Sequence, residues 1–475
     1  MKRNLSRVTA VVLSVGTMGC AASPYVPQTP VLPPPPSSLK IPTAEILQTN
    51  FKQPTPKPGT TESNPAVSSA PLQVDDLVGT AIAQNPRLAR ATFAIDAAQG
   101  RFAQAGLYPN PVLAITADEL GDRQGPGGII TAPQISQEIV TGRKLSLSQA
   151  VAAREVDQSS LGLLRERYAV IGSVRAAFYD LYALERRLAV LDELAKLAAD
   201  AVKNGQILFD NKQIARLDLI QLEVEQARFR SQADSARREL PGARNRLAAA
   251  VGNPRLEIGT IAGPYEDVPK YDANRTLETV LATHPDIRSA RLAVDSAHVA
   301  VHRAEVEWIP NVTLSSGYVR QNQNKSDDFL LGVSAPIPVW NRNQGNIRAA
   351  RAEFAMAGQD VGRVENELAE RVAIALRTYS AAVKLAEQYR TDVLPKAEET
   401  YRLSLEAFKG AQFEYLRVIQ SQRSVAEARL EYNRALGEAW RAAAELSALL
   451  LEEWWPGPPP TRAPNLPPGN LPKVK

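Results

Sequence analysis

The stretch FLLGVSAPIPV, residues 329–339, indicates the fold class of this chain. Apolar residues occupy every second position, and a period of two is that of a β-strand. One predicted face carries Phe329, Leu331, Val333, Ala335, Ile337 and Val339, and the other carries Gly332, Ser334, Pro336 and Pro338. A strand of about ten residues with one apolar face has the length and pattern of a tilted strand in a membrane barrel.

Three further segments, 111–119, 129–139 and 312–320, repeat this pattern. Their expected apolar faces hold Leu113, Ile115 and Ala117 in the first, Ile129, Ile135 and Ile139 in the second, and Val312, Leu314 and Tyr318 in the third. Polar residues fill the predicted loops 121–128 and 321–328. Because a membrane barrel needs at least about eight strands, four strands per chain require an oligomer. A small soluble antiparallel sheet has the same alternation, so the strands alone leave both possibilities open.

Two long stretches, 143–208 and 343–408, have the period of helices. In the first, leucines recur three or four residues apart at Leu181, Leu184, Leu188, Leu191, Leu194 and Leu197. About 65 helical residues form a rod of roughly 95 Å. Such rods have no single globular core, so we expect them to pack side by side along coiled-coil-like seams.

The chain from 72 to 455 divides into two similar halves. Asn85-Pro86 in the first half matches His284-Pro285, which lies 199 positions later (85 to 284). Further matches are Pro109-Asn110 with Pro310-Asn311, Gly142-Arg143-Lys144 with Asn341-Arg342-Asn343, and Ile214–Gln221 with Phe413–Gln420. The spacing predicts two tandem structural repeats, 72–262 and 263–455. Each would hold one helix (74–106 or 274–308), two strands, a long helical stretch, a turn and another helix.

The two ends of the chain differ from the repeats. Residues 1–20 place basic residues ahead of an apolar run too short to span a bilayer, which predicts an export signal. The run ends at Thr17-Met18-Gly19-Cys20, which resembles a lipoprotein cleavage box with Cys20 as the lipid-bearing residue, although Thr17 stands where Leu is usual. An ordinary signal peptide cut near Ala21 or Ala22 is the alternative. Residues 21–71 and 456–475 are Pro-rich, which predicts a disordered tether and a disordered tail.

Composition argues against an enzyme and against a nucleic-acid-binding protein. The chain has 55 basic and 51 acidic residues, and the two signs are interspersed instead of forming a basic stripe. His298 and His302 lie one helical turn apart but lack a third ligand, so ordinary helix histidines are favoured over a metal site. The sequence contains no phosphate-binding loop and no evident Ser-His-Asp arrangement. We therefore expect no catalytic residue, no cofactor and no metal.

Four motifs give the chain a family resemblance. They are Asn85-Pro86 with the following helix, Gly106–Pro111, Gln137–Lys144, and the pair Ala407–Gly410 and Tyr415–Arg423 at the second helical turn. Together they resemble the TolC-like outer membrane efflux protein (OEP) family, and in particular the channel components of cobalt-zinc-cadmium-type RND exporters. The resemblance implies a mainly α protein with membrane β: a homotrimer whose twelve-stranded outer-membrane β-barrel, four strands per chain, continues into a long α-helical barrel through the periplasm.

The resemblance also implies partners and a gate. The trimer would be the passive exit duct of a tripartite efflux system, held in outer-membrane lipid and joined to a periplasmic membrane-fusion adaptor and an inner-membrane RND-type pump. The turns 210–217 and 409–416 would form the periplasmic tip, where the channel contacts the adaptor protein. The implied tip residues are Lys212, Gln213, Leu217, Asp218, Gly410, Ala411, Tyr415, Leu416, Arg417 and Gln420.

This tip departs from the family pattern. Lys212 and Ala411 stand where family members usually have Gly, and Arg417 and Gln420 stand where some members have a ring of Asp. Asp218 is the nearest remaining acidic candidate. The family branch suggests heavy-metal cations as cargo, but drugs or other small molecules stay open. A lipid-anchored periplasmic coiled-coil scaffold without a pore also accounts for the helices and the tether.

Overall fold

The computed structural model describes residues 71–456, apart from 119, 121–127, 323–324 and 410–414. The predicted export signal, Cys20, the tether up to residue 70 and the tail from residue 457 lie outside the described residues. They therefore stay predictions.

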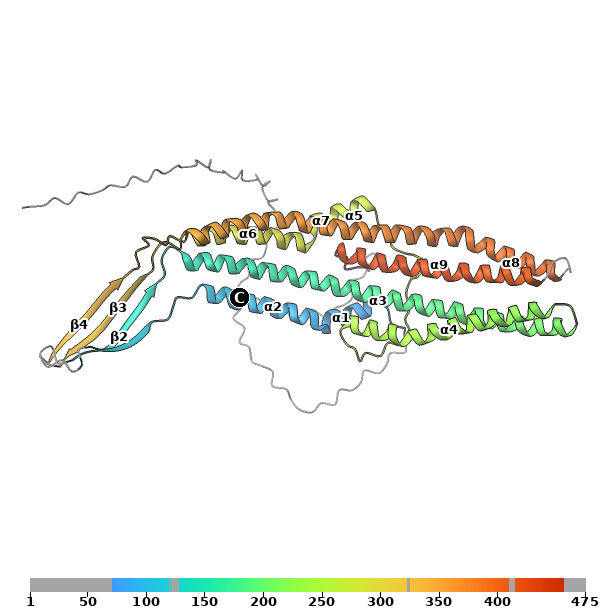
Figure 1. Ribbon diagram of the computed structural model, residues 1–475, viewed down its shortest axis with the longest axis horizontal. Coiled ribbons are helices and arrows are strands. Elements are labelled where there is room, and N and C mark those ends of the chain that lie inside the picture. The colour runs from blue at the N-terminus through green and yellow to red at the C-terminus, as the bar shows by residue number, and fades with distance from the viewer. Residues whose placement is uncertain (1–70, 119, 121–127, 323–324, 410–414, 457–475) are drawn as a thin grey trace, which may run out of the picture. The chain divides into compact units, whose positions relative to one another are not determined.

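Helices and strands follow one another in the same order in the two halves (Figure 1). The first half contains α1 (Val74–Gln84), α2 (Pro86–Ala105), β1 (Val112–Asp118), β2 (Ile129–Ile139), α3 (Lys144–Asp210) and α4 (Arg216–Val251). The second contains α5 (Ala273–Thr283), α6 (Pro285–Glu305), β3 (Val312–Gln321), β4 (Ser326–Ser334), α7 (Gln344–Gln388), the π-helical turn η1 (Tyr389–Val393), α8 (Leu394–Lys409) and α9 (Tyr415–Leu449).

The predicted single helices 74–106 and 274–308 are each broken near their start, so this part of the prediction is wrong. Asn85 and His284 have extended backbones because each precedes a proline, which disfavours the helical conformation. Each side chain then caps the next helix: Asn85 Oδ1 accepts from Arg87 N at 3.0 Å, and His284 Nδ1 accepts from Asp286 N at 3.3 Å. The Asx-Pro and His-Pro steps thus begin α2 and α6, as the sequence indicates.

Asn85 also joins the two ends of the first half. Its Nδ2 donates to the carbonyl oxygens of Ala250 at 3.0 Å and Val251 at 3.2 Å, in the last turn of α4. Gly252 ends α4 with φ +96°, where a Cβ would lie 2.8 Å from the Asn85 Cα. Glycine is required there both by the left-handed backbone and by this close approach.

The two long helical stretches are confirmed, with one interruption. α3 has 67 residues, or about 100 Å at 1.5 Å per residue, and it runs from the sheet to the turn before α4 (Figure 1). The second stretch, predicted as unbroken over 343–408, contains η1 at residues 389–393. Pro395 lies two residues beyond its end and lacks an N–H for the Thr391 carbonyl, which explains the widened turn.

The four strands form one antiparallel sheet in the order β1-β2-β3-β4. β2 contains one extra residue between Thr131 and Gln134, which shifts its register against both neighbours. The shift places Ile129 opposite Gln321, on the face of Gln134 and Ser136. The prediction that Ile129 shares a face with Ile135 is therefore wrong, because a one-residue bulge reverses the alternation.

The fourth strand also differs from its prediction. β4 begins at Ser326 and ends at Ser334, not at 329 and 339. Residues 335–339 leave the sheet because Pro336 and Pro338 have no N–H to donate. The predicted loop 321–328 is correspondingly shorter, since residue 321 belongs to β3 and 326–328 belong to β4.

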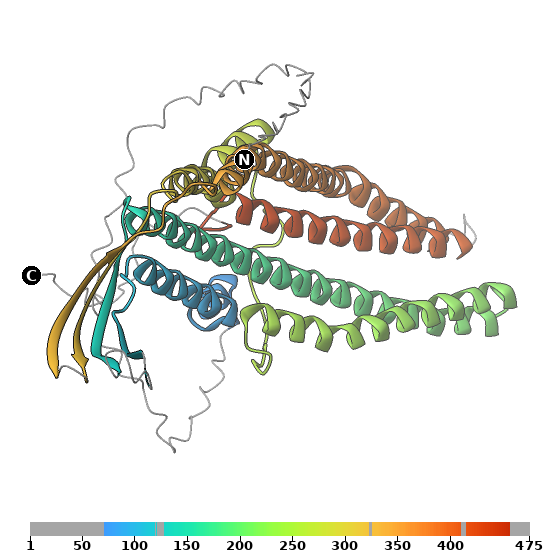
Figure 2. The same ribbon diagram turned by 60° about the vertical axis from the view of Figure 1, so that its left-hand side comes forward.

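The helices pack as two rows that share α3. Beside the sheet the contacts run α2–α3–α6–α7, and towards the α3–α4 turn they run α4–α3–α9–α8 (Figures 1 and 2). The largest buried cluster lies where the rows meet, and Tyr179 of α3 stacks on Trp440 of α9 there at 3.9 Å between ring centroids. No helix among the described residues is both long enough and apolar enough to cross a bilayer.

Candidate functional site

One face of the sheet is apolar and exposed. The register places Leu113, Ile135 and Leu331 in one row across the sheet, and Tyr318 opposite Phe329 in another. Exposure is 69% for Phe329, 76% for Leu331 and 74% for Val333. The opposite face carries mainly polar and small residues, among them Gln134, Ser136, Glu138, Thr313, Ser315 and Gly332. A large exposed apolar surface of this kind is typical of a protein or membrane contact.

The edges of this sheet are open. Among the described residues, β1 pairs only with β2, and β4 pairs only with β3. An unpaired backbone group costs several kcal/mol in hydrocarbon, because no water is present to satisfy it. If the apolar face lies in lipid, both edges must therefore pair with strands of other chains.

Exposed aromatic residues stand at the helical end of the sheet. Tyr108 and Trp308 lie in the links that lead into β1 and β3, and Trp340, which is 89% exposed, lies in the link from β4 to α7. Tyr and Trp are enriched where membrane hydrocarbon meets water. Their position between the apolar sheet and the charged helices matches such a boundary.

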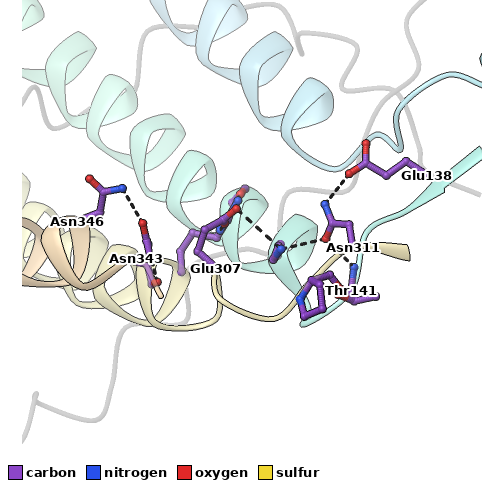
Figure 3. Close-up of polar contacts among 11 residues, drawn as sticks. Glu138, Thr141, Glu307, Asn311, Asn343 and Asn346 are labelled. Carbon is purple, nitrogen blue, oxygen red and sulfur yellow. Dashed lines mark hydrogen bonds and ion pairs between the residues drawn. The ribbon is translucent and has the colours of Figure 1, made fainter. Parts of the chain in front are cut away.

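A partly buried polar network joins the sheet to the helices (Figure 3). Asn311 Oδ1 accepts from Lys144 Nζ at 2.9 Å and from Thr141 N at 3.3 Å, and Asn311 Nδ2 donates to Glu138 Oε1 at 2.7 Å. The Lys144 side chain is 5% exposed, and its Nζ lies 3.8 Å from Glu307 Oε1. Three segments, the end of β2, the start of α3 and the start of β3, are thereby fixed against one another. Sequence reasoning noted these residues as motifs but did not predict that they meet.

The turn between α3 and α4 holds the first set of predicted tip residues. Lys212 adopts φ +60°, a left-handed conformation that favours Gly, and its N–H donates to the Phe209 carbonyl at 2.8 Å. Asp218 Oδ2 accepts from Ala215 N at 3.1 Å and so caps α4. Gln213 is exposed, and Leu217 is 64% exposed. Leu217, one of the implied tip residues, therefore does not pack against the rest of its own chain to any large extent.

The second set of tip residues is described in part. Gly410 and Ala411 lie outside the described residues, and Tyr415 and Leu416 begin α9. Arg417 and Gln420 are exposed on the first turns of α9. The prediction that these residues form the gate stays a prediction.

A charge cluster, which sequence reasoning missed, joins the two helical hairpins behind this tip. Glu225 of α4 is 18% exposed, and its Oε1 lies 3.7 Å from Arg423 Nη1 of α9 and 3.7 Å from Arg228 Nη1. Arg423 also binds Glu427 at 2.9 Å. Nearby, Arg429 contacts Glu193 of α3 at 3.1 Å and Glu398 of α8 at 2.9 Å. Only the long-range pairing distinguishes these residues from the many other charges on the helices.

A polar groove lies beside α3. It measures about 670 Å³ and lies between α2, α3 and α6. Its charges are paired: Arg101 Nε lies 3.1 Å from Glu155 Oε2, and Arg165 Nη1 lies 3.7 Å from Asp286 Oδ1. The arrangement contains no nucleophile held by a base.

The two neighbouring histidines pack together on α6. The rings of His298 and His302 lie 4.8 Å apart, and His298 also contacts Phe354 at 5.5 Å. His302 Nδ1 lies 3.4 Å from Glu305 Oε2. Within the part of the chain that the structure describes, no group of three or more His, Cys, Asp or Glu side chains gathers as a metal site.

An exposed apolar sheet joined to two long helical hairpins is the protomer arrangement that the resemblance to TolC-like outer membrane efflux proteins implies. Residues 276–450 match the family model described as "Outer membrane efflux protein". The chain is also similar in fold to CusC, whose structures concern folding and transmembrane channel formation: the TM-score is 0.69 at 16% identity, over 80% of this chain and 92% of CusC. The resemblance that the motifs indicate is confirmed.

Two curated relatives extend this result. The chain is 25% identical over 390 residues to the cobalt-zinc-cadmium resistance protein CzcC of Cupriavidus metallidurans, which covers 81% of this chain and 91% of CzcC. It is 24% identical over 385 residues to SilC, a probable outer membrane lipoprotein of Salmonella typhimurium, over 74% of this chain and 80% of SilC. The chain therefore resembles outer membrane efflux proteins along most of its length.

Proposed function

We propose that this chain is the outer-membrane exit channel of a tripartite export system. The observation that carries the proposal is the exposed apolar face of the sheet, with polar residues on the opposite face. Lipid would cover the first face, and water in a lumen would cover the second. The aromatic residues Tyr108, Trp308 and Trp340 would lie at the periplasmic boundary of the membrane.

The channel would be a homotrimer. Two chains would give a barrel of eight strands, and side chains would fill its interior. Three chains would give a barrel of twelve strands with a water-filled lumen. Three copies of each four-helix row would continue the barrel as a tunnel of twelve helices. The two halves of each chain, 72–262 and 263–455, would be repeats of one structural unit. Cys20, if lipidated, would add an anchor in the same membrane.

The channel would conduct passively, without a cofactor or a catalytic step. Energy would come from an inner-membrane RND-type pump, and a periplasmic membrane-fusion adaptor would meet the α3–α4 and α8–α9 turns. Heavy-metal cations are the proposed cargo, because CzcC is named for cobalt, zinc and cadmium resistance and covers most of this chain.

Detergent extraction, mass determination and planar-bilayer recording together test the proposal. A channel is expected to give a trimeric mass and discrete conductance steps, and its Cys20→Ser variant is expected to stay in the membrane fraction. A monomer that is released from the membrane by Cys20→Ser and gives no conductance would instead identify a lipid-anchored periplasmic scaffold. A separate experiment tests the cargo. Cells that lack this protein are expected to tolerate less cobalt, zinc or cadmium, and expression of the chain is expected to restore that tolerance.

A further inference from the structure

The polar network at Asn311 joins two halves of one chain. Asn311 follows Pro310 in the link from α6 to β3, and it binds the exit from β2 into α3 through Glu138, Thr141 and Lys144 (Figure 3). Thr141 Oγ1 adds a hydrogen bond of 2.6 Å to the Pro310 carbonyl. The entry of one hairpin is thus bonded to the exit of the hairpin beside it.

The other entry and the other exit are not bonded to each other within the described part of the chain. Each has a bond elsewhere, since Gln137 Nε2 donates to the Pro109 carbonyl at 2.9 Å and Asn343 Nδ2 donates to the Ala304 carbonyl at 2.8 Å. Asn110 follows Pro109 in the link from α2 to β1, as Asn311 follows Pro310. The exit from β4 into α7, Asn341–Gln344, lies at the opposite edge of the sheet, because the strand order is β1-β2-β3-β4. Among the described residues, neither the Asn110 side-chain amide nor the Asn341 N–H has a hydrogen-bond partner, and both residues are exposed.

The two exits have the same backbone shape. Arg143 precedes α3 with φ 56° and ψ 23°, and Asn343 precedes α7 with φ 63° and ψ 20°. Both are left-handed non-glycine residues at the N-cap, which is an uncommon conformation. Matching these two N-caps shifts the sequence match of this region by one residue, from an offset of 199 to one of 200 (143 to 343). Asn341 then takes the position of Thr141, and Gln344 takes the position of Lys144. One edge of the sheet therefore ends in an exit with the same backbone conformation as the β2–α3 exit. The opposite edge begins with an entry whose Asn110 amide has no hydrogen-bond partner among the described residues.

We propose that Asn110 of one copy of this chain binds the Asn341–Gln344 exit of a second copy. Asn110 Oδ1 would accept from the Asn341 N–H of the neighbouring copy, as Asn311 Oδ1 accepts from Thr141 N. Gln344 Nε2 would take the part of Lys144 Nζ. The inference rests on the proposed function, because it needs β1 of one copy to lie beside β4 of the next. It adds the residues that fix the junction between copies.

The junction between copies is weaker than the internal one. The position of Glu138 is held by Pro338, which has no side-chain acceptor for Asn110 Nδ2. Gln344 also makes two hydrogen bonds within its own chain. Its Oε1 accepts from Arg342 N at 2.8 Å, and its Nε2 donates to the Trp340 carbonyl at 3.2 Å. The chain therefore holds its own two hairpins together more firmly than it holds a neighbour.

Disulfide trapping tests the contact. The variant Asn110→Cys/Asn341→Cys is oxidised mildly in membranes and run on a non-reducing denaturing gel. Linked dimers and trimers that a reductant returns to monomers are expected. The control Asn311→Cys/Thr141→Cys, at positions whose Asn311 Oδ1 and Thr141 N lie 3.3 Å apart, is expected to close within one chain and give no larger species. The single variants Asn110→Cys and Asn341→Cys, which keep Cys20, are expected to give no disulfide-linked trimer on this gel.

The native mass of the same samples separates two kinds of failure. If the double variant stays trimeric by native mass but gives no linked species, the Asn110 contact is overturned and the proposed channel stands. If neither the parent chain nor any variant is an oligomer, the contact and the proposed channel both fall. Asn110→Leu provides a second measure: the trimer is expected to dissociate in detergent at a lower temperature than the parent, and an unchanged dissociation temperature would contradict the proposal.

Discussion

The Arg175 guanidinium lies 4.9 Å from the centre of the Trp455 ring, so a buried cation of α3 faces an aromatic ring in the segment that follows α9. Arg175 is 1% exposed, and it donates to Ser447 Oγ at 3.0 Å and to the carbonyls of Glu452 at 2.9 Å and Glu453 at 3.0 Å. Trp455 Nε1 donates in turn to Tyr271 OH at 2.8 Å. This cluster fastens the end of the second half to α3 of the first.

We predict that Arg175→Met lowers the free energy of unfolding by about 3 kcal/mol, because two partly buried carbonyls and the buried Ser447 hydroxyl lose a charged donor. Thermal unfolding in detergent, followed by circular dichroism, measures the change. Arg238→Met, at an exposed position of α4, is the matched control and is expected to change stability by less than about 0.5 kcal/mol. Equal effects of the two substitutions would mean that the Arg175 contacts contribute nothing particular.

Glu452 predicts a pH dependence in the same cluster. Burial raises the pKa of its carboxyl, although the hydrogen bond from Tyr271 OH at 2.9 Å and the charge of Arg175 act in the opposite direction. The folded state then binds the proton more tightly than the unfolded state, so this group makes stability fall as pH rises from the unfolded pKa through the raised one. We expect Glu452→Gln to unfold at a higher temperature than the parent at pH 8 and at a similar one at pH 4. A difference that is independent of pH would contradict this assignment.

The extended features of the fold could be predicted from sequence, because each comes from a pattern repeated over many residues. The seam of leucines at 181–197 follows from the helix period. The Asn85-Pro86 and His284-Pro285 steps mark where α2 and α6 begin, although the single helices expected over 74–106 and 274–308 did not allow for a break there. The extra residue in β2 and the π-helical turn before Pro395 could not be placed, since a single residue changes the register or the turn without altering the pattern. Arg175 looks like any surface arginine in the sequence, and only tertiary contacts distinguish it.

The candidate site was predictable to a similar extent. The apolar sheet face follows from alternation, and the Pro-Asn steps at 109–110 and 310–311 follow from the repeat. The contact between Asn311 and Lys144 joins residues 167 positions apart, and no local pattern carries that information. The charges of Glu225 and Arg423 belong to helices rich in paired charges, so their pairing across two hairpins has no signature in the sequence.

Adjacent residues of β4 test which face of the sheet meets lipid. Leu331 lies on the apolar face and Leu330 on the opposite one, at nearly the same depth along the strand. We predict that Leu331→Lys costs about 2–4 kcal/mol in the membrane and lowers the yield of heat-resistant oligomer, whereas Leu330→Lys faces water and is tolerated. Gel mobility of unheated outer-membrane samples measures the yield. Equal yields of the two variants would argue against a lipid-facing surface on this side.

The Glu225–Arg423 contact predicts a restraint on opening. It joins α4 to α9, so separation of the two hairpins must break it. A partly exposed pair contributes about 0.5–1 kcal/mol, which corresponds to about a two- to fivefold shift of a closed–open equilibrium. We expect Arg423→Gln to raise the open fraction in planar bilayers, and high salt to reduce the difference from the parent. Arg402→Gln is the control, because Arg402 pairs only with Glu399 and Glu406 of its own helix in the described structure; an equal effect of this variant would exclude a specific restraint.

The predicted gate residues Asp218 and Arg417 call for a test that separates charge from helix capping. We expect Asp218→Ala/Arg417→Ala to raise single-channel conductance, because both charged side chains would line the narrow end of the channel. Asp218→Ala also removes the hydrogen bond to Ala215 N and so costs about 0.5–2 kcal/mol of helix stability. Asp218→Asn/Arg417→Ala keeps a capping oxygen and removes both charges, so it is expected to raise conductance without this loss. If only Asp218→Ala/Arg417→Ala raises conductance, the loss of the cap on α4 explains the effect. If neither double variant raises conductance, these residues lie outside the gate.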